Sequence, residues 1–417
     1  MKCQALTQPA HRDYCLIPHR TMGSAAAVTL RGRLLHAHDG CIARSLGGIF
    51  ARLGRFEVAE AKRVPLTLHV ARASVAERSA AATSLFVLNT HTDDEGFVDV
   101  RLVGNALAPG RYEARVETTD APARQRLRSR LVKNRGVEET LVGHLPFVIL
   151  PPHHARVAVF DLDETLICSQ PSSLRGVLDM LVREPTDVQT TPAMAQLARL
   201  LAQDGILLAV SGSPEGLRAD LEAILRRHGV HFLGGVALTH TETYLRGRQR
   251  PFEHKLRVLL ERLGDLPAGV RVDFIGDDRK ADPFVYDVVA GLIAGRWSEV
   301  QLTANLARCG LRRESRRRMA RAVARAHLSK LRLGEVIILR VRSQPEAMDV
   351  TMPVRLVRDA LQAAAVLVAS GRLPGGAVPY VAASLRAHVG ALAVRQSVID
   401  AQTRALPGAA VLRCCLS

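Results

Sequence analysis

Short apolar runs, separated by helical patterns, divide residues 156–300 into alternating strands and helices. The runs that have the length of buried strands are 157–160, 206–210 and 270–275. Leucines at helical spacing follow in the segments 194–201, 217–225 and 256–263. Strands that alternate with helices in this way predict an α/β fold with a parallel sheet.

Between residues 28 and 118 the pattern changes to runs in which apolar and polar residues alternate. The clearest of these runs are 28–35, 64–70, 97–102 and 111–116. Alternation with a period of two residues, with turn residues between the runs, predicts a small antiparallel β-sandwich. This domain carries no catalytic signal, so we expect an accessory or interaction domain.

The domain boundaries are expected where these patterns change. Residues 1–27 show no periodicity and are expected to be a flexible N-terminus, followed by the sandwich at 28–118. Residues 119–155 are expected to be a linker, and its two prolines, Pro151 and Pro152, stiffen it. The catalytic domain is expected at 156–300 and a basic helical C-terminal region at 301–417.

Acidic residues follow two of the predicted strands where each strand ends. Asp161 and Asp163 come directly after the first strand, and Asp277 and Asp278 follow the third after one glycine. In an open α/β sheet, catalytic groups gather at the carboxyl ends of the strands. Asp161 is placed as a nucleophile, and Asp163 could protonate the leaving oxygen and then activate water. Taken alone, the first pair is also consistent with a strand that ends in a turn with solvated acids.

Two further features favour the binding of an anion. Ser211 and Gly212 follow the second strand, and a hydroxyl with free N–H groups at a helix N-terminus forms an anion site. Lys255 lies near the start of a predicted helix, where the dipole disfavours a cation that has no anionic partner. Each feature taken alone has an alternative explanation: Ser213 could only cap the helix, and Lys255 could be a solvated lysine. Together, three strand ends of matching chemistry indicate a phosphate-processing site.

The carboxylates would repel an incoming phosphate, so the pattern predicts a divalent cation. Mg²⁺ is a hard ion that is commonly bound by one or two carboxylates and a substrate phosphate. Asp161 and Asp277 are its expected carboxylate ligands. The backbone carbonyl of Asp163 is a further expected ligand. Asp278 or Asp282 is expected to contribute directly or through water.

Four motifs therefore occur in order along the chain: Asp161-Leu162-Asp163-Glu164-Thr165, Ser211, Lys255 and Gly276-Asp277-Asp278. They match the motifs of the haloacid dehalogenase-like phosphatases, which the chain resembles. Longer stretches narrow the match: Ser211 to Pro214, Glu253 to Leu256, and Ile275 to Tyr286. These stretches resemble the phosphatidate phosphatase domain of the yeast actin patch protein and its bacterial relatives, and the resemblance covers roughly residues 28–295.

The resemblance implies a haloacid dehalogenase-like, Rossmann-like three-layer fold with a minimal cap, preceded by a β-sandwich as in the bacterial relatives. It implies Mg²⁺-dependent hydrolysis of phosphatidate to diacylglycerol and phosphate. The chain departs from these relatives at Glu215-Gly216, where they have an aromatic residue, and at Asp278, where they have a small one. Two alternatives remain open: the same chemistry on a soluble or nucleic-acid phosphate monoester, and a non-catalytic module that senses phosphatidate.

The charge of the chain is large and uneven. A formal net charge of +17 and a sequence pI near 10.4 imply an acidic partner, such as nucleic acid, an anionic membrane or a phosphorylated substrate. Residues 308–342 contain twelve Lys and Arg and two Glu, which is a net charge of +10. We expect this segment to contact anionic membranes peripherally, because it lacks the interleaved aromatics and recognition motifs of nucleic-acid binding. A solvated basic helix is the alternative.

Cysteine usage and hydropathy indicate the compartment. Seven scattered cysteines with no CxxC pair argue against a disulfide framework or a zinc site and fit a reducing compartment. No apolar segment of a signal peptide follows Met1, and the most apolar late stretch, 361–369, is about half the length that spans a bilayer. We therefore expect a cytoplasmic protein. The sequence indicates no oligomeric state.

Overall fold

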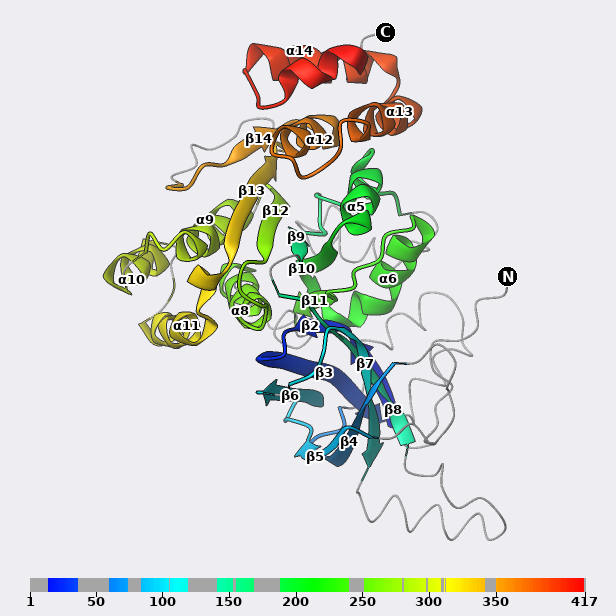
Figure 1. Ribbon diagram of the computed structural model, residues 1–417, viewed down its shortest axis with the longest axis vertical. Helices are drawn as coiled ribbons and strands as arrows, with labels where there is room; N and C mark the ends of the chain where they lie inside the picture. The colour runs from blue at the N-terminus through cyan, green and yellow to red at the C-terminus, as the bar shows by residue number, and fades with distance from the viewer. Residues whose placement is uncertain are drawn as a thin grey trace. The chain divides into compact units, whose positions relative to one another are not determined.

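The computed structural model describes residues 14–36, 60–73, 84–104, 106–118, 141–152, 155–168, 188–239, 251–279, 281–297, 299–308, 311, 313–341 and 350–415 (Figure 1). The chain divides into two compact units, Met1–Pro151 and Pro152–Ser417. The boundary between them lies within the range 119–155 that was expected to be a linker.

Unit 1 contains two β-sheets that share one apolar core. The three-stranded sheet has the order β1 (Tyr14–His19), β3 (Ala27–His36), β6 (Phe97–Val103). The five-stranded sheet has the order β2 (Thr21–Gly23), β8 (Leu141–Ile149), β7 (Gly110–Thr118), β4 (Pro65–Arg72), β5 (Phe86–His91). Alternate apolar residues of both sheets, such as Leu30 and Leu68, fill the core, as a period of two residues requires.

Unit 1 is larger than the range 28–118 expected for the sandwich. Strands β1 and β2 lie within residues 1–27, which were expected to be flexible, and β8 lies within the expected linker. Tyr14 and Leu16 of β1 are buried in the shared core, which explains why these residues are part of the sandwich. Strand β2 pairs with β8 in parallel, so the five-stranded sheet is mixed and not purely antiparallel as expected.

Unit 2 is built on a parallel sheet of six strands. Their order is β11 (Val236–Thr239), β10 (Ile206–Pro214), β9 (Arg156–Phe160), β12 (Arg271–Asp277), β13 (Arg332–Leu339), β14 (Arg355–Val357). All neighbouring strands pair in parallel. The expected α/β fold with a parallel sheet is therefore confirmed. The central strand β9 is buried from Val157 to Phe160, as its uncharged sequence predicts.

Helices cover both faces of this sheet (Figure 1). Helices α5 (Met194–Gln203) and α6 (Arg218–Arg227) lie on one side, and α8 (Pro251–Gly264) and α9 (Asp282–Ile293) lie on the other. Beyond α9, α10 (Glu299–Arg308) packs on α11 (Arg313–Ala326), which in turn packs on α8. Right-handed crossovers between parallel strands produce this arrangement. In the part of the chain that the structure describes, no helix is both long and apolar enough to cross a bilayer.

The C-terminal part of the chain completes this sheet. Residues 301–417 were expected to be helical, but β13 and β14 belong to this range and extend the sheet from β12. They are followed by α12 (Ala360–Ala369), α13 (Ala377–Val389) and α14 (Ala391–Thr403), and α12 packs against α5. The expected boundary at residue 300 therefore separates strands of one sheet. The reason is that Ile337 and Ile338 of β13 are buried beside β12.

A buried ion pair ties the C-terminal helices to β12. The Nε of Arg372, which follows α12, donates to Oδ2 of Asp273 at 2.6 Å, and both side chains are 0% exposed. Oδ1 of Asp273 accepts a hydrogen bond from the backbone N–H of Glu335 at 2.9 Å. A Cβ at Gly334 would lie 2.0 Å from the same oxygen, so a glycine is required there. Asp273 thus joins β12, β13 and the chain after α12.

Candidate active site

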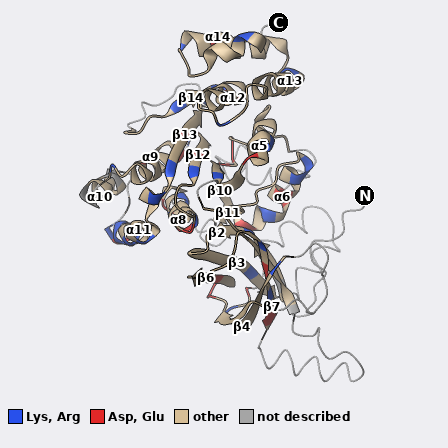
Figure 2. Ribbon diagram, viewed as in Figure 1, with Lys and Arg blue, Asp and Glu red and all other residues tan. Residues whose placement is uncertain are grey.

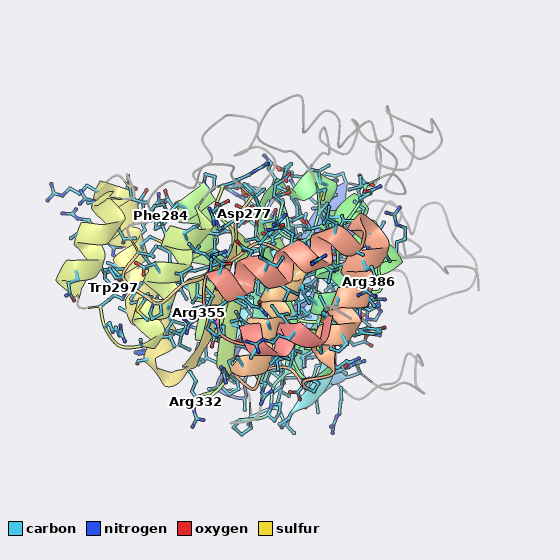
Figure 3. The ribbon with its side chains drawn as sticks, turned by 90° about the horizontal axis from the view of Figure 1, so that it is seen from above. Asp277, Phe284, Trp297, Arg332, Arg355 and Arg386 are labelled. Carbon is cyan, nitrogen blue, oxygen red and sulfur yellow. The ribbon has the colours of Figure 1, made fainter. Side chains whose placement is uncertain are left out.

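The residues predicted to be catalytic lie at the carboxyl ends of β9, β10 and β12. Asp161 and Asp163 follow β9, Ser211 lies in the last part of β10, and Asp277 ends β12. The N–H of Asp161 donates to the carbonyl of Ile275 at 2.9 Å, which continues the pairing of β9 with β12 up to the first acid. The three acids and the serine are each at most 3% exposed. Figure 3 labels Asp277, the last residue of β12.

Lys255 of α8 connects two of the acids. Its Nζ donates to Oδ1 of Asp161 at 2.7 Å and also to Oδ1 of Asp282, the first residue of α9. All three side chains are buried. Burial lowers the pKa of Lys255, but the carboxylates of Asp161 and Asp282 outweigh it, so the pKa lies well above its ordinary value. Lys255 is therefore a charged ammonium between two acids.

The acids of this site are only partly balanced by that ammonium. Burial raises the pKa of Asp161 well above its usual value, Asp282 and Asp163 raise it further, and Lys255 opposes them. Burial also raises the pKa of Asp282, with Asp277 adding to the effect and Lys255 opposing it. Four acidic side chains thus interact around one lysine. An additional cation would lower the pKa of these carboxyl groups and stabilise their charged forms.

Two serine hydroxyls hold Asp163. The Oγ of Ser211 donates to Oδ2 of Asp163 at 2.7 Å, and the Oγ of Ser213 lies 2.9 Å from Oδ1 and 3.0 Å from Oδ2. The N–H of Ser213 donates to the Oγ of Ser211 at 2.9 Å. Ser211, which was expected to bind phosphate, thus contacts an acid here. A helix cap was the alternative interpretation of Ser213, and no contact with Asp163 was predicted for it. Its spacing of two residues from Ser211 on a strand places both side chains on one face.

The two acids after β12 have different surroundings. Oδ1 of Asp277 accepts a hydrogen bond from the N–H of Arg279 at 2.6 Å. Oδ1 of Asp278 accepts one from the N–H of Val341 at 2.8 Å, and the Asp278 N–H donates to Leu339 O at 3.0 Å. Asp278 thus anchors the segment that follows β13.

The chemistry of the donors fits Mg²⁺, although no complete set of ligands is assembled. Within the described residues, no three His, Cys, Asp or Glu side chains form a group that could hold a metal. Oδ2 of Asp282 is buried and, among the described residues, has no hydrogen-bond partner. In the described part of the chain, the site contains more carboxylates than cationic side chains. Carboxylate oxygens are ligands that Mg²⁺ prefers. The expected ligands Asp161, Asp163, Asp277 and Asp282 lie in this region, and Lys255 joins two of them.

The chain turns sharply after Asp163. Glu164 has a φ of 64°, a left-handed conformation that is uncommon for a residue other than glycine. Its carboxylate pairs with Arg279 at 3.3 Å, and the N–H groups of Leu166 and Ile167 both donate to Leu162 O. Strained backbone of this kind clusters at functional sites. The turn keeps Asp163 pointing toward the serines of β10.

A second buried ion pair lies beside the serines. Glu215 pairs with Arg218, whose guanidinium also donates to the carbonyl of Val236 at 2.8 Å. Glu215 and Arg218 are 4% and 5% exposed. Through Arg218, Glu215 therefore connects the end of β10 to β11.

The chain has no match among family models or among curated proteins. Among solved structures it is similar to a chain in the structure of a Pnkp1/Rnl/Hen1 complex, with 13% identity and a TM-score of 0.25, over 40% of this chain and 57% of that one. It is also similar to a cycloisomaltooligosaccharide glucanotransferase of Paenibacillus sp. in complex with cycloisomaltoheptaose. That comparison has 10% identity and a TM-score of 0.19, over 81% of this chain and 54% of the other. The chain thus spans 54–57% of the length of these structures, and both likenesses are too low to support a conclusion about fold or function.

Proposed function

We propose that this protein is a Mg²⁺-dependent phosphatase of the haloacid dehalogenase-like type that hydrolyses phosphatidate to diacylglycerol and phosphate. The observation that carries the proposal is the difference between its two leading acids. Asp161 contacts the ammonium of Lys255 at 2.7 Å, whereas Asp163 is held by the hydroxyls of Ser211 and Ser213. Two carboxyl groups in different environments support a division into nucleophile and proton carrier.

In the proposed first step, a carboxylate oxygen of Asp161 attacks the phosphorus atom. The bond from phosphorus to the lipid oxygen breaks, and that oxygen takes a proton from Asp163 as diacylglycerol leaves. In the second step, Asp163 accepts a proton from a water molecule that attacks the aspartyl-phosphate. The bond between Asp161 and phosphorus then breaks, which releases phosphate and restores the carboxylate.

The remaining residues bind and balance charge. The ammonium of Lys255 favours the charged, nucleophilic form of the Asp161 carboxyl, against the opposing effects of burial and of the neighbouring acids. On substrate binding, the Ser211 hydroxyl would exchange Asp163 for a phosphate oxygen, next to the backbone N–H of Gly212. When bound, Mg²⁺ neutralises the phosphate oxygens, and Asp161, Asp277 and Asp282 supply carboxylates for it.

The experiment is phosphate release by the purified protein with Mg²⁺, compared for phosphatidate, lysophosphatidate and p-nitrophenyl phosphate. We expect turnover of phosphatidate, and a loss on the order of 10²–10³ in rate for Lys255→Met, since one preorganised charge is removed. Release from no substrate contradicts the enzymatic proposal. Release from p-nitrophenyl phosphate alone keeps the chemistry and rejects the lipid substrate.

Asp163→Asn separates an enzyme from a module that only senses phosphatidate. An enzyme loses turnover, because the amide can neither give nor accept the proton, whereas a sensor retains its binding and its effect. The matched control is Asp94→Asn in unit 1, which removes a carboxylate from an exposed ion pair with Arg63. We expect this control to leave phosphate release unchanged.

A further inference from the structure

Helix α11 presents a continuous basic face. Its buried residues Ser315, Met319 and Ala326 lie on one side, and α11 packs with α8. The exposed side carries five arginines, Arg313, Arg317, Arg318, Arg321 and Arg325. A spacing of three or four residues places these side chains along one face of the helix. In Figure 2, much of the α11 ribbon is blue, the colour of Lys and Arg. Glu314 is the acidic residue in the first turn.

The contacts between α11 and α8 fix the direction of this face. Arg318 pairs with Glu253 at 3.4 Å, two residues before Lys255. At the other end, a Cβ on Gly264 would lie 3.1 Å from the Cα of Ala326. The arginine-rich first half of α11 therefore lies beside the part of α8 that carries the lysine of the candidate site.

An exposed aromatic residue belongs to the same edge of unit 2. Phe284 lies two residues after Asp282, near the start of α9, and it is 39% exposed although its neighbours Asp282 and Pro283 are buried. Figure 3 shows Phe284 and Asp277 toward one edge of the unit and Arg332 toward the opposite edge. The candidate site is thus flanked by a large apolar side chain and by a basic helix.

We propose that this surface, Phe284 with Arg313, Arg317, Arg318 and Arg321, docks on membranes that contain anionic phospholipids, and we call it the docking edge. The proposal rests on the proposed function. Phosphatidate stays in its bilayer, and the side chain of Asp161 is only 2% exposed, so the candidate site must be held against the membrane to reach the substrate. Arginines attract anionic headgroups, and an aromatic side chain inserts at the boundary between headgroups and acyl chains.

The arginines of α11 complement any anionic surface, and the lack of aromatic side chains on this helix favours a membrane over nucleic acid. Nucleic-acid surfaces of this kind interleave several aromatic side chains with the basic ones, so that successive bases can stack. The described part of α11 contains no aromatic residue, and its exposed face consists of arginines with Glu314 and Ala324. An anionic bilayer needs only basic residues and one inserting side chain, which the docking edge provides.

The test is sedimentation of the full chain with phosphatidylcholine vesicles, with and without phosphatidylglycerol. Phosphatidylglycerol is anionic but carries no phosphate monoester, so it reports the surface and not the catalytic site. We expect binding that needs the anionic lipid and that weakens with salt. Arg313→Gln/Arg317→Gln/Arg321→Gln should lower the affinity on the order of 100-fold, since each arginine near the surface contributes about fivefold.

The matched control removes the same charge elsewhere. Arg332→Gln/Arg395→Gln/Arg413→Gln changes three exposed arginines, at the start of β13, in α14 and near the C-terminus. It should lower the affinity less than about fivefold, whereas Phe284→Ser should lower it about tenfold. An equal loss in both triple variants would show an effect of net charge alone and overturn the docking edge. So would wild-type protein that binds RNA through these arginines and does not sediment with the vesicles.

The docking edge and the proposed function fail in different ways. Asp163→Asn should sediment with the anionic vesicles as strongly as the wild-type protein, because binding needs no proton transfer. Sedimentation without phosphatase activity in the wild-type protein would reject the function and keep the surface. Phosphatase activity without sedimentation would keep the function and reject the docking edge.

Discussion

Replacing Arg372 by methionine should destabilise unit 2, because the buried Asp273 then has, among the described residues, only the more distant cation of Arg271, whose Nε lies 3.9 Å from its Oδ1. The two side chains are 0% exposed and 2.6 Å apart, so neither charge can turn to solvent. Methionine keeps the apolar stem of the arginine and removes the charged head. The substitution therefore tests the ion pair with little change in packing.

The magnitude follows from what remains around Asp273. Breaking a buried ion pair by removing one partner typically costs about 3–5 kcal/mol. The Glu335 N–H still donates to Asp273 at 2.9 Å, and a hydrogen bond to a charged group contributes about 1.5–3 kcal/mol. We therefore expect a loss at the lower end, about 3 kcal/mol in the free energy of unfolding of unit 2.

Urea unfolding followed by tryptophan fluorescence measures this loss. The chain has one tryptophan, Trp297, which lies in unit 2 between α9 and α10, so its signal reports that unit. The control is Arg395→Met on the exposed side of α14, which should change the free energy of unfolding by less than about 0.5 kcal/mol.

A double variant decides whether the charge is the cause. Arg372→Met with Asp273→Asn removes both charges and keeps an oxygen that accepts the Glu335 N–H. It should recover about half of the loss or more. If Arg372→Met costs less than about 1 kcal/mol, or if the double variant is less stable than the single one, an uncompensated buried charge is not the cause.

Three predictions concern the candidate site. Ser213→Ala should lower kcat about 10–100-fold with little change in KM, because Asp163 loses a hydrogen bond to a charged group, and Ser213→Thr, which keeps the hydroxyl, should retain most of the rate. Gly276→Ala should lower activity on the order of 100-fold in folded protein, because its Cβ would lie 2.6 Å from Oδ2 of Asp282; wild-type rates would contradict the assigned position of that acid. Removal of divalent cations with EDTA should abolish phosphate release and added Mg²⁺ should restore it, and activity that survives chelation would contradict the metal requirement.

The strands of the sheet that could be predicted are those whose own sequence is apolar enough to indicate a buried strand. The runs 157–160, 206–210 and 270–275 are short and apolar, and they form β9, β10 and β12. Because the carboxyl ends of parallel strands meet at one edge, the acids and serines that follow these runs could be grouped from the amino-acid sequence alone.

The strands that were missed depend on tertiary contacts. Strand β13 begins with exposed Arg332 and contains Glu335, and it follows an arginine-rich helix, so its pattern resembles a continuation of that helix. Strand β14 has three residues, which is too short for periodicity to show. The contacts of Asp163 with Ser213 and of Lys255 with Asp282 join residues far apart in the chain, and only the fold brings them together.

The position of β13 and β14 at the edge of the sheet determines how the chain can be shortened. A chain ended at residue 300, where the amino-acid sequence suggested a domain boundary, would turn β12 into an outer strand. Phe274 and Ile275 are fully buried, and their backbone would become a template for pairing with other molecules, so such a fragment should aggregate during expression. It would also lack Arg372 and leave the buried Asp273, within the described part of the chain, with only the cation of Arg271, at 3.9 Å. A shortened form for biochemical work therefore has to retain the chain through Arg372.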